Sequence, residues 1–511
     1  MIQADVLGER ARLTPEKTAL VLADTGVRLS YSELDQRASR CAIAWTESLD
    51  LEPGDRIGIL AHNRLEYLDA FFAAGKSGVV LVTLGTRLTP HELSHVIDDS
   101  GMRALLYDGA FAATVDELRQ RVEVETWIAL DDPVESSDPV HAALLSNADP
   151  ADWRGRRIDP EALYCLLYTS GTTGRPKGVM IPHRMVAWNG LNTVASWQLR
   201  EDDVSPIFTP LYHAGGLMAF LVPLVTIGGT IVLHRGFDTS QIWRTIESER
   251  CTVVLGVPTI WKMLLEAPEF ASVDLQHVRA FYSGGAPLPS FIIEAYQEKG
   301  VVFKQGFGMT EVGVNCFAMT VEDSFRKAGS IGRPMMFTEV RLVDEEGKDV
   351  PQGEVGEMLF RGPHVSQGYW HNAEATSAAL DKNGWFHSGD LARCDEEGYY
   401  YVAGRRKDMI ISGGVNVYPA EIEAELLQHE AVEDVAVVGV PDRKWGEMGV
   451  AFVVPLGGKE VTPETLIEHL ESRLARFKIP KVFRIVESLP RTAYGKVVKG
   501  ELRELFLKEG G

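Results

Sequence analysis

The chain reads LYTSGTTGRPKGV from Leu167 to Val179, a stretch that combines hydroxyl side chains, glycines and one lysine, Lys177. An apolar run from Ala162 to Leu167, typical of a buried strand, comes directly before it. The polar groups of this stretch would be unsatisfied in a core, whereas glycines let the backbone turn its N–H groups toward a ligand. Donors together with one cation suit a polyphosphate. The stretch therefore predicts a phosphate-binding loop after a buried strand, and a flexible surface hairpin is the alternative.

The loop is not a Walker P-loop, because Pro176 precedes the lysine and Gly178 follows it. Strand and helix patterns alternate on both sides of the loop, which predicts parallel sheets with helices on their faces. The expected strands are Arg56–Leu60, Val79–Val82, Ala104–Tyr107, Thr230–Leu233, Val253–Val257, Arg279–Ser283 and Val301–Phe303. The expected helices include one capped by Ser32, one over Leu65–Ala74 and one opened by Thr89 and Pro90.

The pattern changes to short strands and turns from about Ser330, which predicts a β-rich subdomain over about 330–404. A run of charge follows Gly404, and beyond it lies a compact α+β segment. We therefore expect an α/β fold with two domains. Residues 1–404 would form a large N-terminal domain of two α/β sheet subdomains plus the β-rich one. Residues 405–511 would form a small, mobile α+β C-terminal domain.

Composition limits the function classes. A chain of 511 residues exceeds one ordinary core, and a net charge of −21 argues against nucleic acid as a partner. The five cysteines are scattered, which favours buried thiols in the reducing cytoplasm. Ala214–Leu233 is uncharged, but Pro223 and Gly228 interrupt it, so we expect no transmembrane segment. Whether the chain forms a homodimer stays open.

Three further motifs carry polar chemistry. Gln305–Glu311 joins two glycines, a hydroxyl and a carboxylate on a turn. A carboxylate beside bound phosphates needs a cation between them, and Mg²⁺ is the hard ion that bridges the two; a capped helix start is the alternative. Asp390, after Gly389, can accept both hydroxyls of a ribose, or can form an ordinary Asx turn. Pro490–Lys496 ends in a lysine that is either functional or simply solvated.

The phosphate loop and these motifs, in this order, resemble the adenylate-forming superfamily of acyl- and aryl-CoA synthetases, nonribosomal adenylation domains and luciferases. The resemblance covers nearly the whole chain and is closest to bacterial fatty-acid–CoA ligases. It implies roles for many residues. ATP contacts would come from Thr169, Ser170, Gly171, Thr172, Thr173, Gly174, Lys177, Gly285, Ala286, Pro287, Gly306, Phe307, Gly308, Asp390 and Arg405.

The same resemblance implies that Glu311 binds Mg²⁺, that Thr310 contacts phosphate and that Lys496 reaches the α-phosphate from the C-terminal domain. Lys407 falls on the hinge position. Contacts with the acid or coenzyme A would come from Tyr212, His213, Gly216, Trp385, Ser412, Gly413 and Gly414.

We therefore predict an AMP-forming carboxylate–CoA ligase that uses ATP, Mg²⁺ and coenzyme A. A medium- or long-chain fatty acid is the leading substrate, and an aryl acid such as benzoate, anthranilate or a cinnamate is the rival. Because no carrier domain follows, we expect a free-standing ligase rather than part of a nonribosomal synthetase. A nucleotide-sensing relative without turnover is the third reading, disfavoured because every catalytic position of the family is present.

Overall fold

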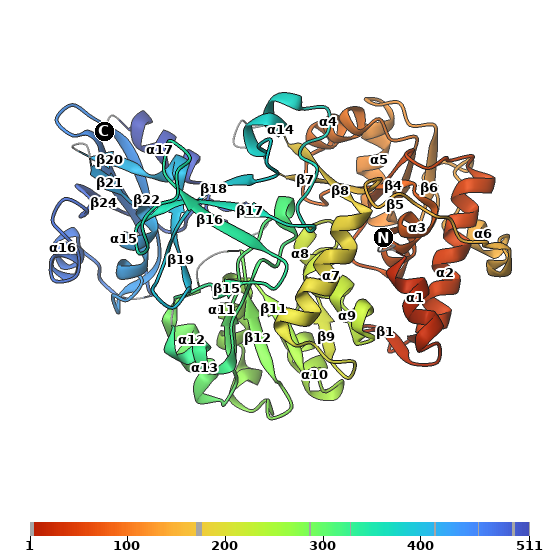
Figure 1. Cartoon of the computed structure of the whole chain (residues 1–511), viewed down its shortest axis with the longest axis horizontal. Coiled ribbons are helices and arrows are strands. Elements are labelled where there is room, and N and C mark those ends of the chain that lie inside the picture. Colours follow the sequence, from red (N-terminus) through yellow and green to blue (C-terminus); the bar gives the residue numbers. More distant parts are fainter. Residues whose placement is uncertain are drawn as a thin grey trace.

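The computed structural model describes residues 5–169, 176–285, 288–327, 329–412, 415–457, 459–492 and 496–509. The C-terminal elements lie at one end of the molecule beside the antiparallel strands of the β-rich subdomain, and the N-terminal helices lie at the other end (Figure 1). The fold is α/β, with a large N-terminal and a small C-terminal domain, as predicted. The boundary near Lys407 stays a prediction.

The first two sheets are mainly parallel. The six-stranded sheet runs in the order β6 (Thr126–Ala129), β5 (Ala104–Tyr107), β3 (Arg56–Leu60), β4 (Val80–Thr83), β7 (Leu163–Thr169), β8 (Lys177–Pro182). The four-stranded sheet runs β2 (Arg28–Ser30), β1 (Thr18–Leu22), β10 (Thr230–Leu233), β9 (Val204–Ile207). Only the β7–β8 and β1–β2 pairs among these strands are antiparallel. Ligands of such sheets bind beyond the carboxyl ends of the strands.

The remaining sheets complete both domains. Three parallel strands, β11 (Val253–Gly256), β12 (Ala280–Ser283) and β13 (Phe303–Gln305), form the third α/β sheet. The β-rich subdomain holds β16 (Glu339–Val343), β17 (Gly356–Arg361), β18 (Phe386–Cys394) and β19 (Tyr400–Arg405), with the pair β14 (Phe317–Ala318) and β15 (Arg333–Pro334). The C-terminal sheet holds β20 (Ile410–Ser412), β21 (Val415–Val417), β22 (Val432–Asp442), β23 (Gly446–Pro455) and β24 (Val482–Ile485).

The helices cover these sheets. In the N-terminal domain they are α1 (Val6–Leu13), α2 (Tyr31–Ile43), α3 (Leu65–Ser77), α4 (Pro90–Ser100), α5 (Ala112–Arg119), α6 (His141–Ser146), α7 (His183–Trp197), α8 (Ala214–Gly216), α9 (Val222–Ile227), α10 (Thr239–Ser248), α11 (Pro258–Glu266), α12 (Ser290–Glu298), α13 (Val321–Arg326) and α14 (Ala373–Ala379). In the C-terminal domain they are α15 (Pro419–Leu426), α16 (Pro463–Glu471) and α17 (Lys499–Lys508).

Two local predictions from the sequence are wrong in detail. Ser30, not Ser32, caps α2, because its hydroxyl accepts from the Glu33 N–H while the Glu33 carboxylate accepts from the Ser30 N–H. The sequence predicts the third strand of the small parallel sheet over Val301–Phe303, but the observed strand β13 spans Phe303–Gln305. The strand therefore runs directly into the Gln305–Glu311 motif instead of ending before it. The cap of α4 by Thr89 is as predicted.

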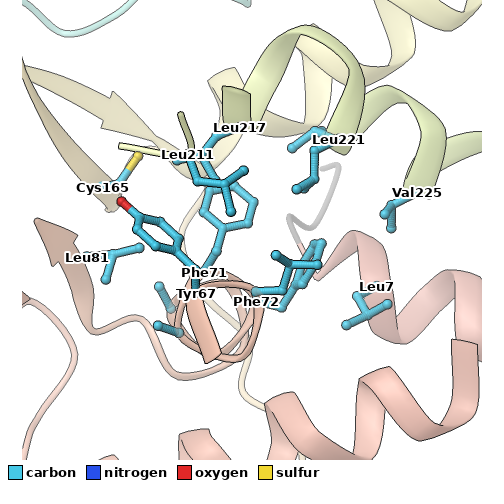
Figure 2. Close-up of a cluster of buried hydrophobic side chains, with 14 of the residues drawn as sticks. Leu7, Tyr67, Phe71, Phe72, Leu81, Cys165, Leu211, Leu217, Leu221 and Val225 are labelled. Atoms are coloured by element: carbon cyan, nitrogen blue, oxygen red, sulfur yellow. The ribbon is translucent and has the colours of Figure 1, made fainter. Parts of the chain in front are cut away.

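The main core joins the first two sheets through helices. Tyr67, Phe71 and Phe72 of α3 lie near Leu217 and Leu221 of the helical segment before α9 (Figure 2). That segment, including Pro223 in the first turn of α9, is buried within the protein. No helix in the described part of the chain is long and apolar enough to cross a membrane.

His183, the first residue of α7, is buried, and burial lowers its pKa to about 4. Because the unfolded state binds a proton more readily, the stability due to neutral His183 is present above pH 6.5 and is lost as pH falls toward 4. We expect His183→Gln to remove about 3 kcal/mol of this pH-dependent loss. Denaturant unfolding of the wild type and the variant at several pH values measures how the free energy of unfolding depends on pH. If the two proteins lost stability equally as pH falls, the expectation would be contradicted.

Candidate active site

The site begins where the three strands of the small parallel sheet end. The Gly284 N–H donates to the Gly256 carbonyl at 3.3 Å, and the Gly306 N–H donates to the Ser283 carbonyl at 2.8 Å. The ends of β11, β12 and β13 are therefore side by side, and each continues into a glycine or a glycine-rich turn. This is the edge at which a ligand of an open α/β sheet binds, and it brings the turn after β12, which holds Gly284 and Gly285, close to Gly306.

The stretch that the sequence predicts to bind phosphates connects β7 to β8. Thr169 pairs with Lys177 across this hairpin, so the two ends of the loop are held opposite each other. Several predicted site residues lie outside the described residues, and for these the structure gives no test: Ser170, Gly171, Thr172, Thr173, Gly174, Ala286, Pro287, Gly413 and Gly414.

Glu311 lies in the short 3-10 turn Thr310–Val312 and is buried. Its Oε1 accepts a hydrogen bond from the Tyr369 hydroxyl at 3.0 Å. Lys177 Nζ lies 5.3 Å from the centre of the Tyr369 ring. Desolvation raises the pKa of Glu311, although Tyr369, Arg405 and Lys496 act in the opposite direction. The end of the phosphate loop and the buried carboxylate thus meet at one tyrosine.

Tyr369 was missed by the sequence reasoning. Its position depends on contacts between distant segments, because its backbone bridges to Val179 and its hydroxyl reaches Glu311. A signal was available at Gly368, which has φ +100° and packs against Thr376 so closely that a side chain would collide with it. A glycine forced into that conformation directly before an aromatic residue marks a fixed turn.

Asp390 and Arg405 pair across β18 and β19, and Arg405 Nε lies 3.3 Å from Asp390 Oδ1. Asp390 is buried, and desolvation raises its pKa, while Arg405 and Lys496 act to lower it. The structure therefore brings together the two residues for which the resemblance implies ribose contacts. Because the Arg405 guanidinium is half-exposed, it neutralises the Asp390 carboxylate only in part, and the carboxylate can still accept hydrogen bonds from hydroxyl groups.

Lys496 lies in a C-terminal loop that folds back on itself. The Thr492 N–H donates to the Lys496 carbonyl at 2.7 Å, and the Lys496 N–H donates to Thr492 Oγ1 at 3.2 Å. The residue keeps an exposed surface, yet desolvation lowers the pKa of its ammonium group. Arg405 lowers it further, while Asp390 and Glu311 oppose the shift. The C-terminal lysine is thus close enough to both buried carboxylates of the N-terminal domain to change their titration.

Tyr212 is buried, His213 is partly buried, and the charge of the same lysine acts on His213. Desolvation lowers the pKa of His213 to about 3, helped by the charge of Lys496. The Thr83 hydroxyl donates to the Tyr212 carbonyl at 2.9 Å, and Asn63 Oδ1 accepts from the Leu211 N–H at 2.8 Å. Asn63 and Thr83, which follow β3 and end β4, therefore hold this segment at the edge of the large sheet. With its pKa lowered to about 3, His213 is neutral at physiological pH.

The residues predicted to contact the acid or coenzyme A, or to form the hinge, lie in different environments. Trp385 packs with Val343 and Leu359, and the Arg361 guanidinium lies 4.5 Å from its ring centre. Ser412 is buried at the end of β20, and Lys407 is exposed in the turn Arg406–Asp408. The roles of these residues stay predictions.

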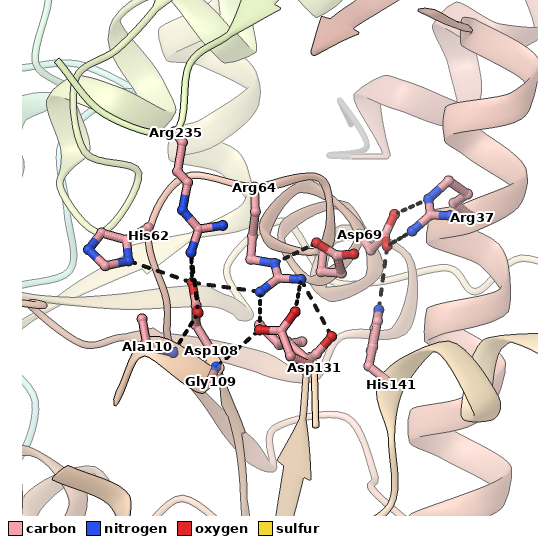
Figure 3. Close-up of polar contacts among 12 residues, drawn as sticks. Arg37, His62, Arg64, Asp69, Asp108, Gly109, Ala110, Asp131, His141 and Arg235 are labelled. Carbon is pink, nitrogen blue, oxygen red and sulfur yellow. Dashed lines mark hydrogen bonds and ion pairs between the residues drawn. The ribbon is translucent and has the colours of Figure 1, made fainter. Parts of the chain in front are cut away.

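A separate polar cluster joins two sheets (Figure 3). Buried Asp108, after β5, lies 3.6 Å from Arg64 and 3.2 Å from Arg235, which follow β3 and β10. Arg64 also pairs with Asp131 at 2.8 Å. Arg64 pairs with Glu66 at 2.7 Å as well. Because Asp108 is shared between Arg64, beside the large sheet, and Arg235, beside the four-stranded sheet, the cluster is best understood as a tie between the two sheets.

Gly308 and Gly306 differ in what a side chain would meet. A Cβ on Gly308 would lie 1.9 Å from the Val314 carbonyl oxygen, whereas one on Gly306 would lie 3.7 Å from Trp197 Cζ2. Val314 itself has φ +53°, which is strained for a β-branched residue. This strained turn follows Glu311 and holds the backbone of Val314 close against Gly308.

We therefore expect Gly308→Ala to destabilise the protein by about 3 kcal/mol, because backbone atoms must move apart. Gly306→Ala is the matched control in the same motif and is expected to fold normally, since its new contact is an ordinary one. Thermal unfolding of both variants measures this difference. Equal melting temperatures would show that the turn is not constrained as described.

Sequence and structure comparisons place the chain among known proteins. The sequence profile of AMP-binding enzymes matches residues 7–370, and that of the AMP-binding enzyme C-terminal domain matches residues 421–496. A feruloyl-CoA synthase from Amycolatopsis sp is 40% identical over 501 residues, which is 97% of each chain. The long-chain-fatty-acid–CoA ligase FadD13 of Mycobacterium tuberculosis is 36% identical over 512 residues, 98% of each chain.

A solved structure agrees. The O-succinylbenzoate coenzyme A synthetase of Bacillus subtilis, in complex with ATP and magnesium ion, superimposes with a TM-score of 0.85. The two are 32% identical, and the match covers 98% of this chain and 99% of that one. The chain therefore belongs to the AMP-binding enzyme family, and it is an adenylate-forming carboxylate–CoA ligase.

Proposed function

We propose that Lys496, Glu311 and Asp390 form one adenylation site for ATP. A carboxylate oxygen of the acid attacks the α-phosphorus, the bond to the bridging oxygen of pyrophosphate breaks, and acyl-AMP forms. No protein nucleophile takes part, so positioning and charge neutralisation supply the catalysis. Lys496 neutralises charge on the α-phosphate, and Asp390 with Arg405 binds the ribose. The observation that carries this assignment is the convergence of the Asp390–Arg405 pair, at 3.3 Å, and the buried Glu311 held by Tyr369, with Lys496 near enough to lower the pKa of both carboxylates.

We propose that Glu311 holds Mg²⁺ together with phosphate oxygens. Mg²⁺ is commonly bound by one or two carboxylates plus substrate phosphates, and a buried carboxylate at the end of the phosphate hairpin fits that pattern. When bound, the ion would neutralise charge on the phosphates of ATP. Tyr369 orients the carboxylate through its hydroxyl, and Thr310 supplies a hydroxyl donor beside it.

In the second half-reaction the sulfur of coenzyme A attacks the acyl carbonyl, and AMP leaves. We propose that the C-terminal domain turns about Lys407, withdraws Lys496 and presents the β20–β21 hairpin to the pantetheine chain. Ser412 sits at the tip of that hairpin, next to the two glycines that lie outside the described residues. The exposure of Lys407 fits a hinge, because little packing has to break when the backbone there rotates.

We propose an aryl-substituted carboxylic acid as the substrate. Trp197, Phe220 and Tyr282 form a buried aromatic group, with Trp197 and Tyr282 stacked at 4.4 Å. A Cβ on Gly306 would lie 3.7 Å from the indole of Trp197, so this aromatic group borders the glycine motif. The 40% identity to a feruloyl-CoA synthase supports the same class. A fatty acid is the second candidate, because a fatty-acid ligase is 36% identical over nearly the whole chain.

A panel of acids tests the proposal. The purified protein receives ATP, Mg²⁺ and coenzyme A with ferulate, cinnamate, benzoate, octanoate or palmitate. We expect AMP, pyrophosphate and the acyl-CoA, with the largest kcat/KM for an aryl acid. A clear preference for octanoate or palmitate would replace the aryl assignment by the fatty-acid one, and release of ADP would refute the adenylation mechanism.

A further inference from the structure

Two neighbouring residues at the start of β22 contact different parts of the protein. Glu433 Oε1 accepts from Lys262 Nζ at 2.7 Å, and Lys262 belongs to α11 of the N-terminal domain. Asp434 forms an ion pair with Arg491. Arg491 begins the loop that carries Lys496. One end of β22 therefore touches both the other domain and the base of the catalytic lysine loop.

The local backbone explains how two adjacent residues reach two partners. The pairing of β22 with β23 shifts register between Val432 and Asp434, which leaves Glu433 as the extra residue of a β-bulge. A bulge redirects a side chain that would otherwise alternate with its neighbours. Glu433 and Lys262 are each about a third exposed, with 36% and 27% of the side-chain surface accessible. The pair is thus partly shielded and still open to solvent.

The Lys262 side of the contact is rigid relative to the nucleotide site. Trp261, the preceding residue, is fully buried and stacks on Phe281 of β12 at 4.8 Å between ring centres. Its Nε1–H donates to the Tyr282 carbonyl at 3.2 Å. The helix starts at Pro258, directly after the end of β11. Lys262 therefore keeps a fixed position with respect to the strand ends that form the site.

The Lys496 side is also constrained. Arg491 and Val497 form an antiparallel bridge that closes the loop, and the Val498 N–H donates to the Pro490 carbonyl at 2.8 Å. Because Arg491 is tied to Asp434, a movement of this end of β22 carries the base of the loop with it. The contacts run from α11 through Glu433 and Asp434 to the loop of Lys496.

We propose that Lys262 and Glu433 form a latch between the domains that holds Lys496 in place for adenylation and opens before thioester formation. Both are positioning residues, and the inference rests on the proposed adenylation role of Lys496. Without the latch, the fraction of molecules in which Lys496 faces the phosphates falls, so the first half-reaction slows. The second half-reaction needs the lysine withdrawn and is not slowed.

The test measures the two half-reactions separately in the full-length enzyme. Lys262→Glu is expected to slow adenylation about tenfold, and Lys262→Gln about fivefold, as loss of a partly exposed ion pair predicts. Both variants should convert chemically supplied acyl-AMP to acyl-CoA at the wild-type rate or faster. The double variant Lys262→Glu/Glu433→Lys restores the pair in reverse and should recover adenylation to within about twofold. Glu266→Gln is the matched control, because Glu266 lies 3.8 Å from Lys262 on the same helix and not in the other domain.

A second readout reports domain orientation without turnover. Dyes on cysteines introduced at the exposed residues Glu298 and Glu471, one in each domain, give an energy-transfer signal. Lys262→Glu should change the signal and the double variant should restore it. Three results would each overturn the latch. They are adenylation and energy transfer that both stay unchanged in Lys262→Glu, equal slowing of the two half-reactions, and a double variant that does not recover adenylation. Failure of the wild type to adenylate any acid would refute the proposed function, while the transfer signal would still decide the latch.

Discussion

Replacing Lys496 by alanine is expected to slow acyl-adenylate formation by at least ~100-fold, the usual cost of losing one preorganised group that stabilises transition-state charge. The charge of its ammonium group acts to lower the pKa of both Glu311 and Asp390, so Lys496 lies close to both carboxylates. Conversion of supplied acyl-AMP to acyl-CoA should proceed nearly unchanged. ATP–pyrophosphate exchange and thioester formation measure the two steps.

The pH dependence gives an independent check. The lowered pKa of Lys496 means that its charge, and with it adenylation, is lost at a lower pH than for an ordinary lysine as pH rises. Lys496→Arg keeps the charge at all these pH values, so the alkaline loss should move to higher pH. Lys499→Gln is the matched control, because Lys499 pairs with Glu423 inside the C-terminal domain. Equal losses in both half-reactions of Lys496→Ala would contradict the assigned role.

Replacing Glu311 by glutamine is expected to have a comparable effect, about 100-fold on adenylation. The amide keeps an acceptor for the Tyr369 hydroxyl, so the turn is preserved, but the charge that would hold Mg²⁺ is lost. Because desolvation raises the pKa of Glu311 in the metal-free protein, Mg²⁺ binding, and with it activity at limiting Mg²⁺, should weaken as pH falls through a value above that of an ordinary glutamate. The variant should lack this acid loss and should need more Mg²⁺. Initial rates across pH and Mg²⁺ concentration measure both effects.

Tyr369→Phe is the control for this prediction, since it removes only the hydrogen bond to Glu311. We expect about a tenfold loss, in the range for a hydrogen bond to a charged group. An unchanged Mg²⁺ requirement in Glu311→Gln, together with wild-type rates, would show that the carboxylate is structural.

The local patterns of the sequence predict the elements that present the site. Strands over Arg56–Leu60, Ala104–Tyr107 and Thr230–Leu233 are found as predicted, because short apolar runs between turns are strong local signals. The cap of α4 is also local and is correct. The juxtaposition of Asp390 with Arg405 followed from a family resemblance and is found across β18 and β19.

Contacts between distant residues could not be predicted in this way. Tyr369 meets Glu311 across 58 positions of the chain, and Lys262 meets Glu433 across 171 positions. Local sequence can mark a residue such as Glu311, but it does not show which distant residue that side chain will meet, because the contact arises only when separate segments pack. The positive φ of Val314 was equally hidden, since a β-branched residue is normally excluded from that conformation and its strain is maintained by packing around Gly308.

The central claim is that the acid attacks the α-phosphorus of ATP and that coenzyme A then displaces AMP. It is tested most directly with an acid whose carboxylate carries heavy oxygen, followed by mass analysis of the nucleotide product. The account predicts that AMP retains one labelled oxygen from the acid and that pyrophosphate carries none. Label in inorganic phosphate, or AMP free of label while acyl-CoA accumulates, would contradict it.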